Sequence, residues 1–268
     1  VIQNLSSRFK ALALSVCFSI FSLAASSSLA QEWPSRPVKV IVPFATGGSA
    51  DVFGRIIAQR LQDALGQGFV VENRPGAGAI IGTDAVAKAT DDHTLGVVIN
   101  GNLTSAKWLY PKLPYDPTKD LLPISLLATS PLLLVSTPDL PKGNAWVDAV
   151  RLAGDKLSYG SVGVGSVGHL GLEVIKAAIA SPGAVHVPYA SNPAILNAMI
   201  SGQVQMALMP PSLAMPQVKA GKLQAVGLTG ARSNFAPDVP ALSEIGVRMT
   251  PLEVWVALVA PAALSKAA

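Results

Sequence analysis

The chain has 268 residues, 50% of them hydrophobic, and its 20 basic and 16 acidic residues give a formal net charge of +4. This length suits one large or two small domains that can bury a sizeable core. Only 6% of the residues are aromatic and no run of Lys or Arg alternates with them, so we expect no nucleic-acid partner.

The first thirty residues have the pattern of a secretory signal peptide. Arg8 and Lys10 precede an apolar stretch at 11–23, and small residues lead to Ala30, after which we predict cleavage and release into the periplasm. A membrane anchor is the alternative, but the apolar run is shorter than the roughly 20 residues that a spanning helix needs. The only cysteine, Cys17, lies inside this segment, so the mature chain has no disulfide or thiolate metal site.

From residue 38 onward, short β-rich runs alternate with helical patterns, which is typical of βα units and a mainly parallel sheet. The fold class is therefore α/β. The first series has predicted strands at 38–44, 69–72 and 95–99, helices at 50–65 and 83–89, and a proline-rich surface passage at 111–123. The second has strands at 132–135, 157–159, 185–187, 204–208 and 223–228, and helices at 146–153, 169–178 and 194–201.

The two series predict two α/β lobes, with residues 123–130 connecting them. We place lobe 1 at 31–127 and lobe 2 at 128–251, and expect residues 252–268 to return to lobe 1 through a strand at 254–259. In open α/β sheets, ligands bind beyond the carboxyl ends of the strands, so the loops that follow the strands are the candidate sites.

The loop after the first strand contains Gly47 and Gly48 and leads into a helix. Unpaired N–H groups at such a helix start favour an anion. Ser49 could cap the helix or donate its hydroxyl to a ligand, whereas Asp51 is most simply a residue that compensates the helix dipole. No lysine follows the glycines with the spacing of a nucleotide-binding P-loop.

Two further glycine loops follow strands. The second spans 76–78 and is preceded by Arg74, which is either a cationic ligand contact or a solvated loop residue. The third, at 163–168, matches G-x-G-x-x-G, but the strand after it ends without an acidic residue for a ribose. We therefore expect no dinucleotide and no other cofactor, although the third loop still offers N–H groups and Ser166 to an anion.

The sequence contains few patterns that are typical of catalytic residues. Histidines 93, 169 and 186 lack metal-ligand spacing, and no G-x-S-x-G motif is present. His169, at a helix start, more simply serves packing or capping than proton transfer. We predict no catalytic residue, no metal site and no enzyme activity.

Several stretches between Trp33 and the end of the chain are specific in combination. They are Trp33-Pro34-Ser35-Arg36-Pro37, Val42-Pro43-Phe44 with Gly47-Gly48 and Asp51, Val71-Glu72-Asn73-Arg74-Pro75-Gly76-Ala77-Gly78, Leu113-Pro114-Tyr115-Asp116-Pro117, Gly168-His169-Leu170, His186-Val187-Pro188-Tyr189, and Val218-Lys219-Ala220-Gly221-Lys222-Leu223. In them the chain resembles the Bug-type, TctC-like extracytoplasmic receptors of tripartite tricarboxylate transporters. The resemblance implies a two-lobed periplasmic-binding-protein clamshell of type II, a monomer that captures a small carboxylate and delivers it to membrane transporter subunits.

The resemblance also implies the ligand contacts. The first two loops would contribute Phe44, Ser49, Ala50, Asp51, Gly76, Ala77 and Gly78, and the second lobe would add Asn100, Ser166, His169 and Tyr189. Ala79 replaces a usual glycine, residues 189–193 form a shorter loop, and Met209-Pro210-Pro211 stands where many relatives have an aspartate. The ligand, whether a di- or tricarboxylate, an acidic amino acid or an aromatic acid, therefore stays open, and an exported enzyme acting on a small carboxylate is the alternative function.

Relatives of this type continue past residue 262 with helices that pack on the first lobe. We therefore expect these C-terminal helices to be missing, and residues 31–268 to be poorly soluble or loosely folded, with the deficit in lobe 1.

Overall fold

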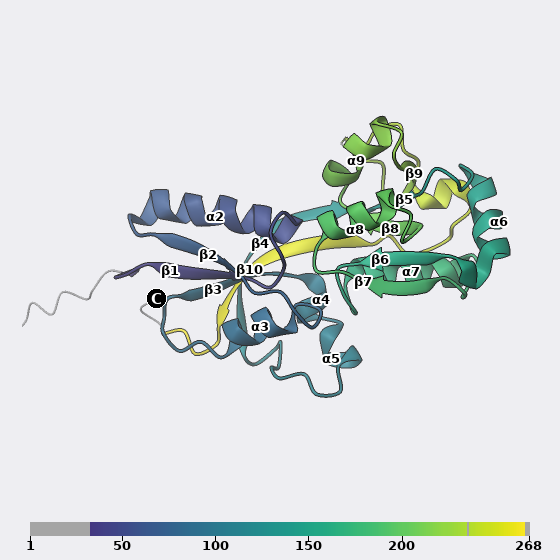
Figure 1. The fold of residues 1–268 in the computed structure, drawn as a ribbon. Coiled ribbons are helices and arrows are strands. Elements are labelled where there is room, and N and C mark those ends of the chain that lie inside the picture. The colour runs from purple at the N-terminus through teal and green to yellow at the C-terminus, as the bar shows by residue number, and fades with distance from the viewer. Residues whose placement is uncertain (1–32, 235, 266–268) are drawn as a thin grey trace, which may run out of the picture. The chain divides into compact units, whose positions relative to one another are not determined.

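The computed structural model describes residues 33–234 and 236–265, so the predicted signal peptide and its cleavage site lie outside the described residues. Residues 36–268 form one compact unit, which holds two five-stranded sheets, A and B (Figure 1). Across the described ranges, no helix combines the length and apolar character that crossing a membrane requires.

Sheet A has the strand order β2-β1-β3-β10-β4, in which β10 runs antiparallel to both of its neighbours and β1 runs parallel to β2 and β3. Its strands are β1 (Val38–Val42), β2 (Phe69–Asn73), β3 (Thr94–Ile99), β4 (Leu121–Pro131) and β10 (Glu253–Pro261). The helices in this part are α2 (Ser49–Leu65), α3 (Ile80–Ala87) and the short α4 (Asn100–Leu103) and α5 (Ala106–Leu109). Every residue of β3 is buried, as expected for a strand covered on both faces, and Figure 1 shows α2 and α3 on opposite faces of the sheet.

Sheet B also has four strands in one direction and one antiparallel strand. Its order is β7-β6-β8-β5-β9, and β5 is the antiparallel strand. Its strands are β5 (Leu133–Ser136), β6 (Ser158–Ser161), β7 (Val185–Pro188), β8 (Met206–Met209) and β9 (Gln224–Leu228). The helices are α6 (Asn144–Ala153), α7 (Val167–Ala178), α8 (Asn192–Ile200) and α9 (Pro211–Lys219), with 3-10 turns η1 (Gly154–Lys156) and η2 (Leu242–Ile245). The helix α9 had no counterpart among the predicted elements.

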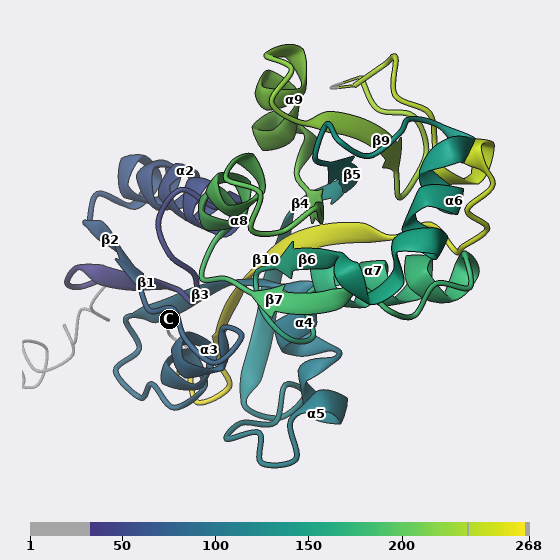
Figure 2. The same cartoon turned by 45° about the vertical axis from the view of Figure 1, so that its right-hand side comes forward.

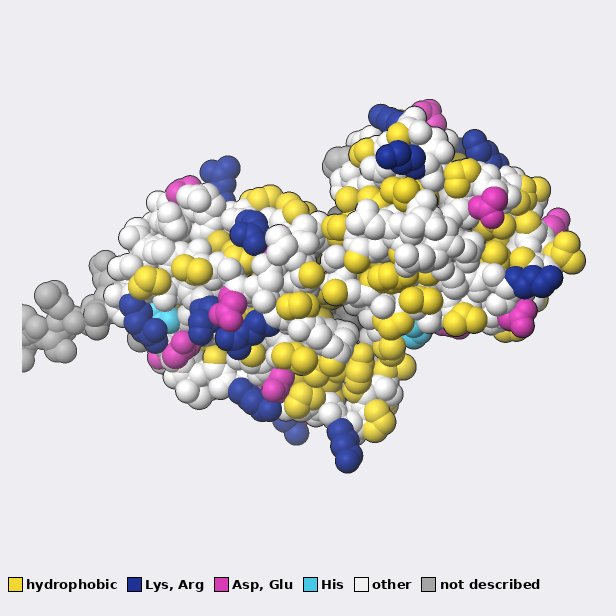
Figure 3. All heavy atoms as spheres, in the orientation of Figure 1, with side chains coloured by type: hydrophobic (Ala, Val, Ile, Leu, Met, Phe, Trp, Pro, Cys, Tyr) yellow, Lys and Arg dark blue, Asp and Glu magenta, His cyan; other side chains and the backbone are white. Residues whose placement is uncertain are grey.

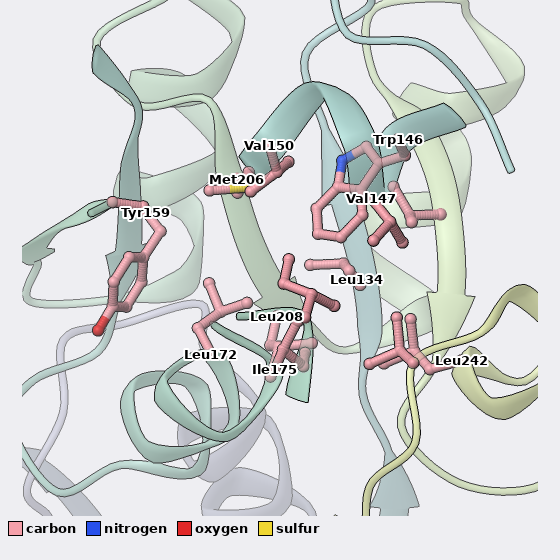
Figure 4. Packing of buried hydrophobic residues seen from close by; sticks show 14 of the residues in the cluster. Leu134, Trp146, Val147, Val150, Tyr159, Leu172, Ile175, Met206, Leu208 and Leu242 are labelled. Atoms are coloured by element: carbon pink, nitrogen blue, oxygen red, sulfur yellow. The ribbon is translucent and has the colours of Figure 1, made fainter. Parts of the chain in front are cut away.

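Side chains alternate between the two faces of sheet B along each strand, so the hydrophobic core forms two clusters, one on each face. On one face, Leu134 of β5 packs with Trp146 of α6 and with Leu172 of α7, in the cluster that Figure 4 shows. On the other face, Leu133 packs with Ile195 of α8 in a second cluster that also includes Ala214 of α9. Helices therefore cover both faces of sheet B, and only the loops at the strand ends are left to bind a ligand.

The chain crosses between the sheets at two places. Residues 123–130 were expected to be a connection, but they belong to β4, which pairs with β10 from Leu121↔Pro261 to Pro131↔Glu253 before the chain enters β5. A strand is possible despite Pro123 and Pro131 because β4 is an edge strand, where a missing N–H breaks no central ladder. The boundary predicted after residue 127 falls inside this strand. The predicted return strand is present as β10, between β3 and β4.

Candidate ligand-binding site

Two cavities lie where loops of the sheet A part meet loops of the sheet B part. The first has a volume of about 40 Å³ and is lined by Phe44, Gly48, Ser49, Ala50, Ile99, Leu132, Val162, Ser166, Val167, Gly168, Ser191, Asn192, Leu208, Pro210 and Val254. The second has about 390 Å³ and is lined by Pro43, Phe44, Pro75, Gly76, Ala77, Gly78, Ala79, Tyr110, Val162, Gly163, Val164, Pro188, Tyr189 and Ala190. Phe44 and Val162 line both cavities, so the two are neighbouring parts of one site.

Helix N-termini converge on the first cavity. Its wall includes residues 48–50 at the start of α2, residues 166–168 at the start of α7, and Ser191 and Asn192 at the start of α8. Each helix N-terminus carries a partial positive charge and unpaired backbone N–H groups. Three such ends around one cavity make it a favourable place for an anion.

A serine side chain caps one N–H group at the start of α7 and one at the start of α8, whereas no side chain caps α2. The hydroxyl oxygens of Ser166 and Ser191 accept the backbone N–H groups of His169 (3.2 Å) and Ala194 (3.3 Å), the usual N-cap arrangement. No side chain caps α2, and the Ser49 hydroxyl has no hydrogen-bond partner among the described residues. The first-turn N–H groups of α2 and the Ser49 hydroxyl are therefore left for a ligand.

Asp51 holds the first glycine loop in place. Its carboxylate accepts hydrogen bonds from the Gly47 N–H (3.0 Å), the Asn73 side-chain amide (2.9 Å) and the Arg55 guanidinium (3.2 Å). Burial raises the pKa of this carboxyl, but the hydrogen bonds from Arg55, Gly47 and Asn73 outweigh it and the net pKa is lowered. Asp51, which the resemblance implied as a ligand contact, lines neither cavity.

The second cavity lies between the glycine loops at 76–78 and 163–165, which touch each other. A Cβ atom built on Gly163 would lie 2.8 Å from the Cα atom of Gly78, and Gly163 has φ +125°, so only glycine fits this approach. The Ser105 hydroxyl donates to the Gly165 carbonyl (2.7 Å) and the Tyr110 hydroxyl to the carbonyl of Val164 (3.2 Å). These contacts join the two sheet-bearing parts in a closed arrangement.

His169 supports the third glycine loop rather than lining a cavity. Its Nδ1 accepts the N–H of Gly165 (3.2 Å), and its ring centroid lies 4.2 Å from that of His186. Burial lowers the pKa of both histidines, and the neighbouring His169 helps to lower the pKa of His186 to about 4. The neutral imidazole that accepts from Gly165 is thus the favoured form.

Asn100 is placed differently from its sequence assignment to the second lobe. It begins α4, directly after β3 of sheet A, and its side-chain amide donates to the backbone carbonyl of Glu253 in β10 (3.1 Å). It therefore ties the end of β3 to the strand that crosses between the sheets. It lines neither cavity.

The remaining predicted contacts lie on the cavity walls. Ser49, Ala50 and Ser166 line the first cavity, Gly76, Ala77, Gly78 and Tyr189 the second, and Phe44 both. Sequence reasoning missed the α8 start, although the order Ser191-Asn192-Pro193 is a helix-start signal that could have found it. Arg74 instead pairs with Glu72 at 2.6 Å and lines neither cavity. Within the described ranges, no group of three or more His, Cys, Asp or Glu side chains is arranged to hold a metal ion.

A model of the tripartite tricarboxylate transporter family receptor matches residues 53–267 of the chain. The chain belongs to this family. Protein BugT of Bordetella pertussis is 35% identical over 239 residues, which cover 87% of this chain and 72% of BugT.

Two solved structures of the same type extend the likeness to the fold. MatC from Rhodopseudomonas palustris with bound malate is 32% identical, with a TM-score of 0.81 over 87% of this chain and 81% of MatC. The periplasmic binding protein BugD is 29% identical, with a TM-score of 0.81 over 87% of this chain and 79% of BugD. The family resemblance and the two-lobed α/β fold expected from the sequence are confirmed.

Proposed function

We propose that this family member is a periplasmic receptor that binds a small carboxylate between its two sheet-bearing parts and delivers it to membrane subunits of a transporter. The observation that carries the proposal is the convergence of the α2, α7 and α8 N-termini on a cavity with uncapped donors at α2. MatC, which shares the fold, was solved with a carboxylate, malate, and this supports the same ligand class here.

A binding screen tests the proposal. The purified mature chain is heated with and without mono-, di- and tricarboxylates, acidic amino acids and aromatic acids, and with their neutral amides as controls. A ligand at a hundredfold excess over its Kd stabilises the protein by about 2.7 kcal/mol, which raises Tm by about 5–10 °C for a chain of this size. No shift with any acid in a folded sample would contradict the proposal.

Two variants locate the site. Gly48 has φ −80° and a Cβ there would meet no atom nearer than 3.9 Å, so Gly48→Val keeps the fold, while its methyl groups cover the free N–H groups of α2. We expect Gly48→Val to lose binding. Arg74→Ala, which removes a charge outside the cavities, is the matched control and should bind as the parent does.

Two measurements separate the remaining alternatives. NMR spectra of the ligand after long incubation should be unchanged, whereas conversion would favour an exported enzyme acting on a small carboxylate. Mass spectrometry of the protein recovered from the periplasm should give Gln31 as the first residue, whereas a retained leader would favour the membrane anchor.

A further inference from the structure

The third glycine loop is held from both sides of the junction through one residue, Gly165. Its N–H donates to Nδ1 of His169 (3.2 Å) within the sheet B part, and its carbonyl accepts the Ser105 hydroxyl (2.7 Å) from the sheet A part. The neighbouring carbonyl of Val164 accepts the hydroxyl of Tyr110 (3.2 Å), an ionisable group that faces the loop from the sheet A part. Figure 2 shows α4 and α5, the segment that carries these two hydroxyls, below the ends of β6 and β7. Any movement of Gly165 away from His169 therefore changes the contacts that close the site.

The contact between His169 and Gly165 requires a neutral imidazole. A backbone N–H can only donate, so Nδ1 must offer its lone pair and the ring proton must lie on Nε2. Protonation of the ring turns Nδ1 into a donor, and two N–H groups then face each other across 3.2 Å. The loop has to move away from the charged ring, and the Gly165 carbonyl that Ser105 holds moves with it.

The carboxylate nearest to the ring is already shared. Glu173, one turn further along α7, accepts hydrogen bonds from Lys176 (2.7 Å) and from the Tyr159 hydroxyl of β6 (2.5 Å). The ring of His186 in β7 stacks on the other side, with its centroid 4.2 Å from that of His169. A proton on His169 therefore adds a positive charge close to Lys176, where the single carboxylate already has two partners.

Solvent protons can reach this pair of histidines. Both side chains are half-buried, and Figure 3 shows histidine surface, in cyan, on the sheet B part beside the junction. Burial, the largest cause, and Lys176 lower the pKa of His169 below 6.5 although Glu173 raises it. Burial and the charge of a protonated His169 lower the pKa of His186 to about 4. His169 is therefore the first of the two to take a proton as the pH falls.

We propose that His169 is a positioning residue that couples ligand capture to pH: the closed site forms while its imidazole is neutral and opens when the imidazole is protonated. This regulation rests on the proposed function and acts on the same site without touching the ligand, because His169 lines neither cavity. Since binding requires the unprotonated ring, Kd is constant at high pH. It rises as the pH falls below the pKa of His169, by at most about tenfold per pH unit for one proton.

Two substitutions at this position separate the proton from the acceptor. In His169→Asn, the side-chain amide oxygen takes the place of Nδ1 and accepts the Gly165 N–H at every pH, but it does not titrate. His169→Ala has no acceptor at all. Isothermal titration calorimetry from pH 8 to pH 5 measures Kd for the parent and both variants with malate, adipate and benzoate, and with any other acid that the screen identifies.

The ratio of the parent Kd to the His169→Asn Kd at each pH removes the protonation of the probes themselves. We expect a ratio near one at pH 8 and a parent that binds more weakly than His169→Asn at pH 5, by a factor of about 3 to 30. His169→Ala should bind weakly at both pH values. A ratio that stays flat from pH 8 to pH 5 would overturn the proposal.

An NMR titration of the 15N-labelled parent tests the loop without a ligand. The Gly165 amide and the His169 imidazole should titrate with one common pKa, and the Gly165 amide should not titrate in His169→Asn. A Gly165 resonance that does not respond to protonation of His169 would also overturn the proposal. If no acid of the screen binds the folded parent at pH 8, the receptor function itself fails, and the NMR titration still decides whether the loop responds to His169.

Discussion

Gly101 tests whether the ligand is held by closure of the two parts upon each other. It lies in α4 with an ordinary helical backbone, and a Cβ atom there would lie 2.7 Å from the carbonyl oxygen of Gly165 across the junction. Cβ atoms in proteins essentially never approach other atoms within 3.0 Å. The substitution Gly101→Ala therefore forces the third glycine loop to move away, while it introduces no strain into lobe 1 itself.

The expected effect follows from this overlap. Overpacking by one methyl group costs about 1–3 kcal/mol, and here the cost falls only on the closed state that contains both cavities. The Kd of any bound carboxylate should rise about 5- to 150-fold, since about 1.4 kcal/mol corresponds to a factor of ten. The Tm without ligand should not fall, because alanine is favoured over glycine at helical positions.

Calorimetric titration and thermal melting of the parent, Gly101→Ala and Gly68→Ala measure both quantities. Gly68 is the matched control, because its backbone does not require glycine and a Cβ there would meet only Pro37 at 3.8 Å. If Gly101→Ala binds with the affinity of the parent, the approach of α4 to the third glycine loop plays no part in binding, and the closed geometry described above is not the ligand-bound one.

Four further changes have expected outcomes. Asp51→Asn removes the ion pair and weakens the hydrogen bonds of the first glycine loop, so chemical denaturation should show a loss of about 1–3 kcal/mol, with the exposed Asp63→Asn as a near-neutral control. The pKa of His186 is lowered from 6.5 to about 4, so the unfolded chain binds more protons than the folded chain between these pH values. The free energy of unfolding should therefore fall by about 1–2 kcal/mol as the pH drops from 6.5 to 4, after allowance for the partial exposure of the side chain. An unchanged pH profile of stability in His186→Gln would refute this origin. Tyr110→Phe removes one hydrogen bond across the junction and should weaken ligand binding by about 0.5–1.5 kcal/mol without lowering Tm, whereas a stability loss alone would place its role within lobe 1. Leu126→Lys, on the exposed edge strand β4, should reduce self-association in light scattering, and no change would show that this edge does not drive association.

The sequence predicted the elements whose residues follow one clear period. Buried strands such as Val38–Val42 and Thr94–Ile99, and the helix Ser49–Leu65 that ends at Gly66, agree closely with the pattern of apolar residues and glycines. The strand β4 was not predicted because it contains Pro123 and Pro131. Proline is tolerated in an edge strand but not in a central one, and only the sheet order shows that β4 lies at the edge. Pro211 and Pro216 concealed α9, although Pro211 stands in the first turn, where proline is well tolerated, and only Pro216 lies inside the helix.

The glycine loops that line the cavities were predictable because each follows a predicted strand and leads toward a helix, and ligands bind beyond the carboxyl ends of strands in open α/β sheets. What the sequence could not show is which polar side chains are occupied elsewhere. Asp51 is engaged by Gly47, Asn73 and Arg55, and His169 by Gly165, and these partners come from distant segments or depend on loop geometry. The Ser191-Asn192 start of α8 joined the site only once the fold had brought the ends of α2, α7 and α8 together.

The position of β10 has a consequence for how the chain folds as it is made. All strands of sheet B come from the continuous stretch 133–228, so that sheet can form as soon as this stretch has been synthesised. Sheet A lacks its fourth strand until residues 253–261 arrive, and until then the facing edges of β3 and β4 are both unpaired. Strand pairing between such distant segments is slow. Lobe 1 therefore lacks a complete sheet until residues 253–261 have been made, whereas sheet B can already be complete.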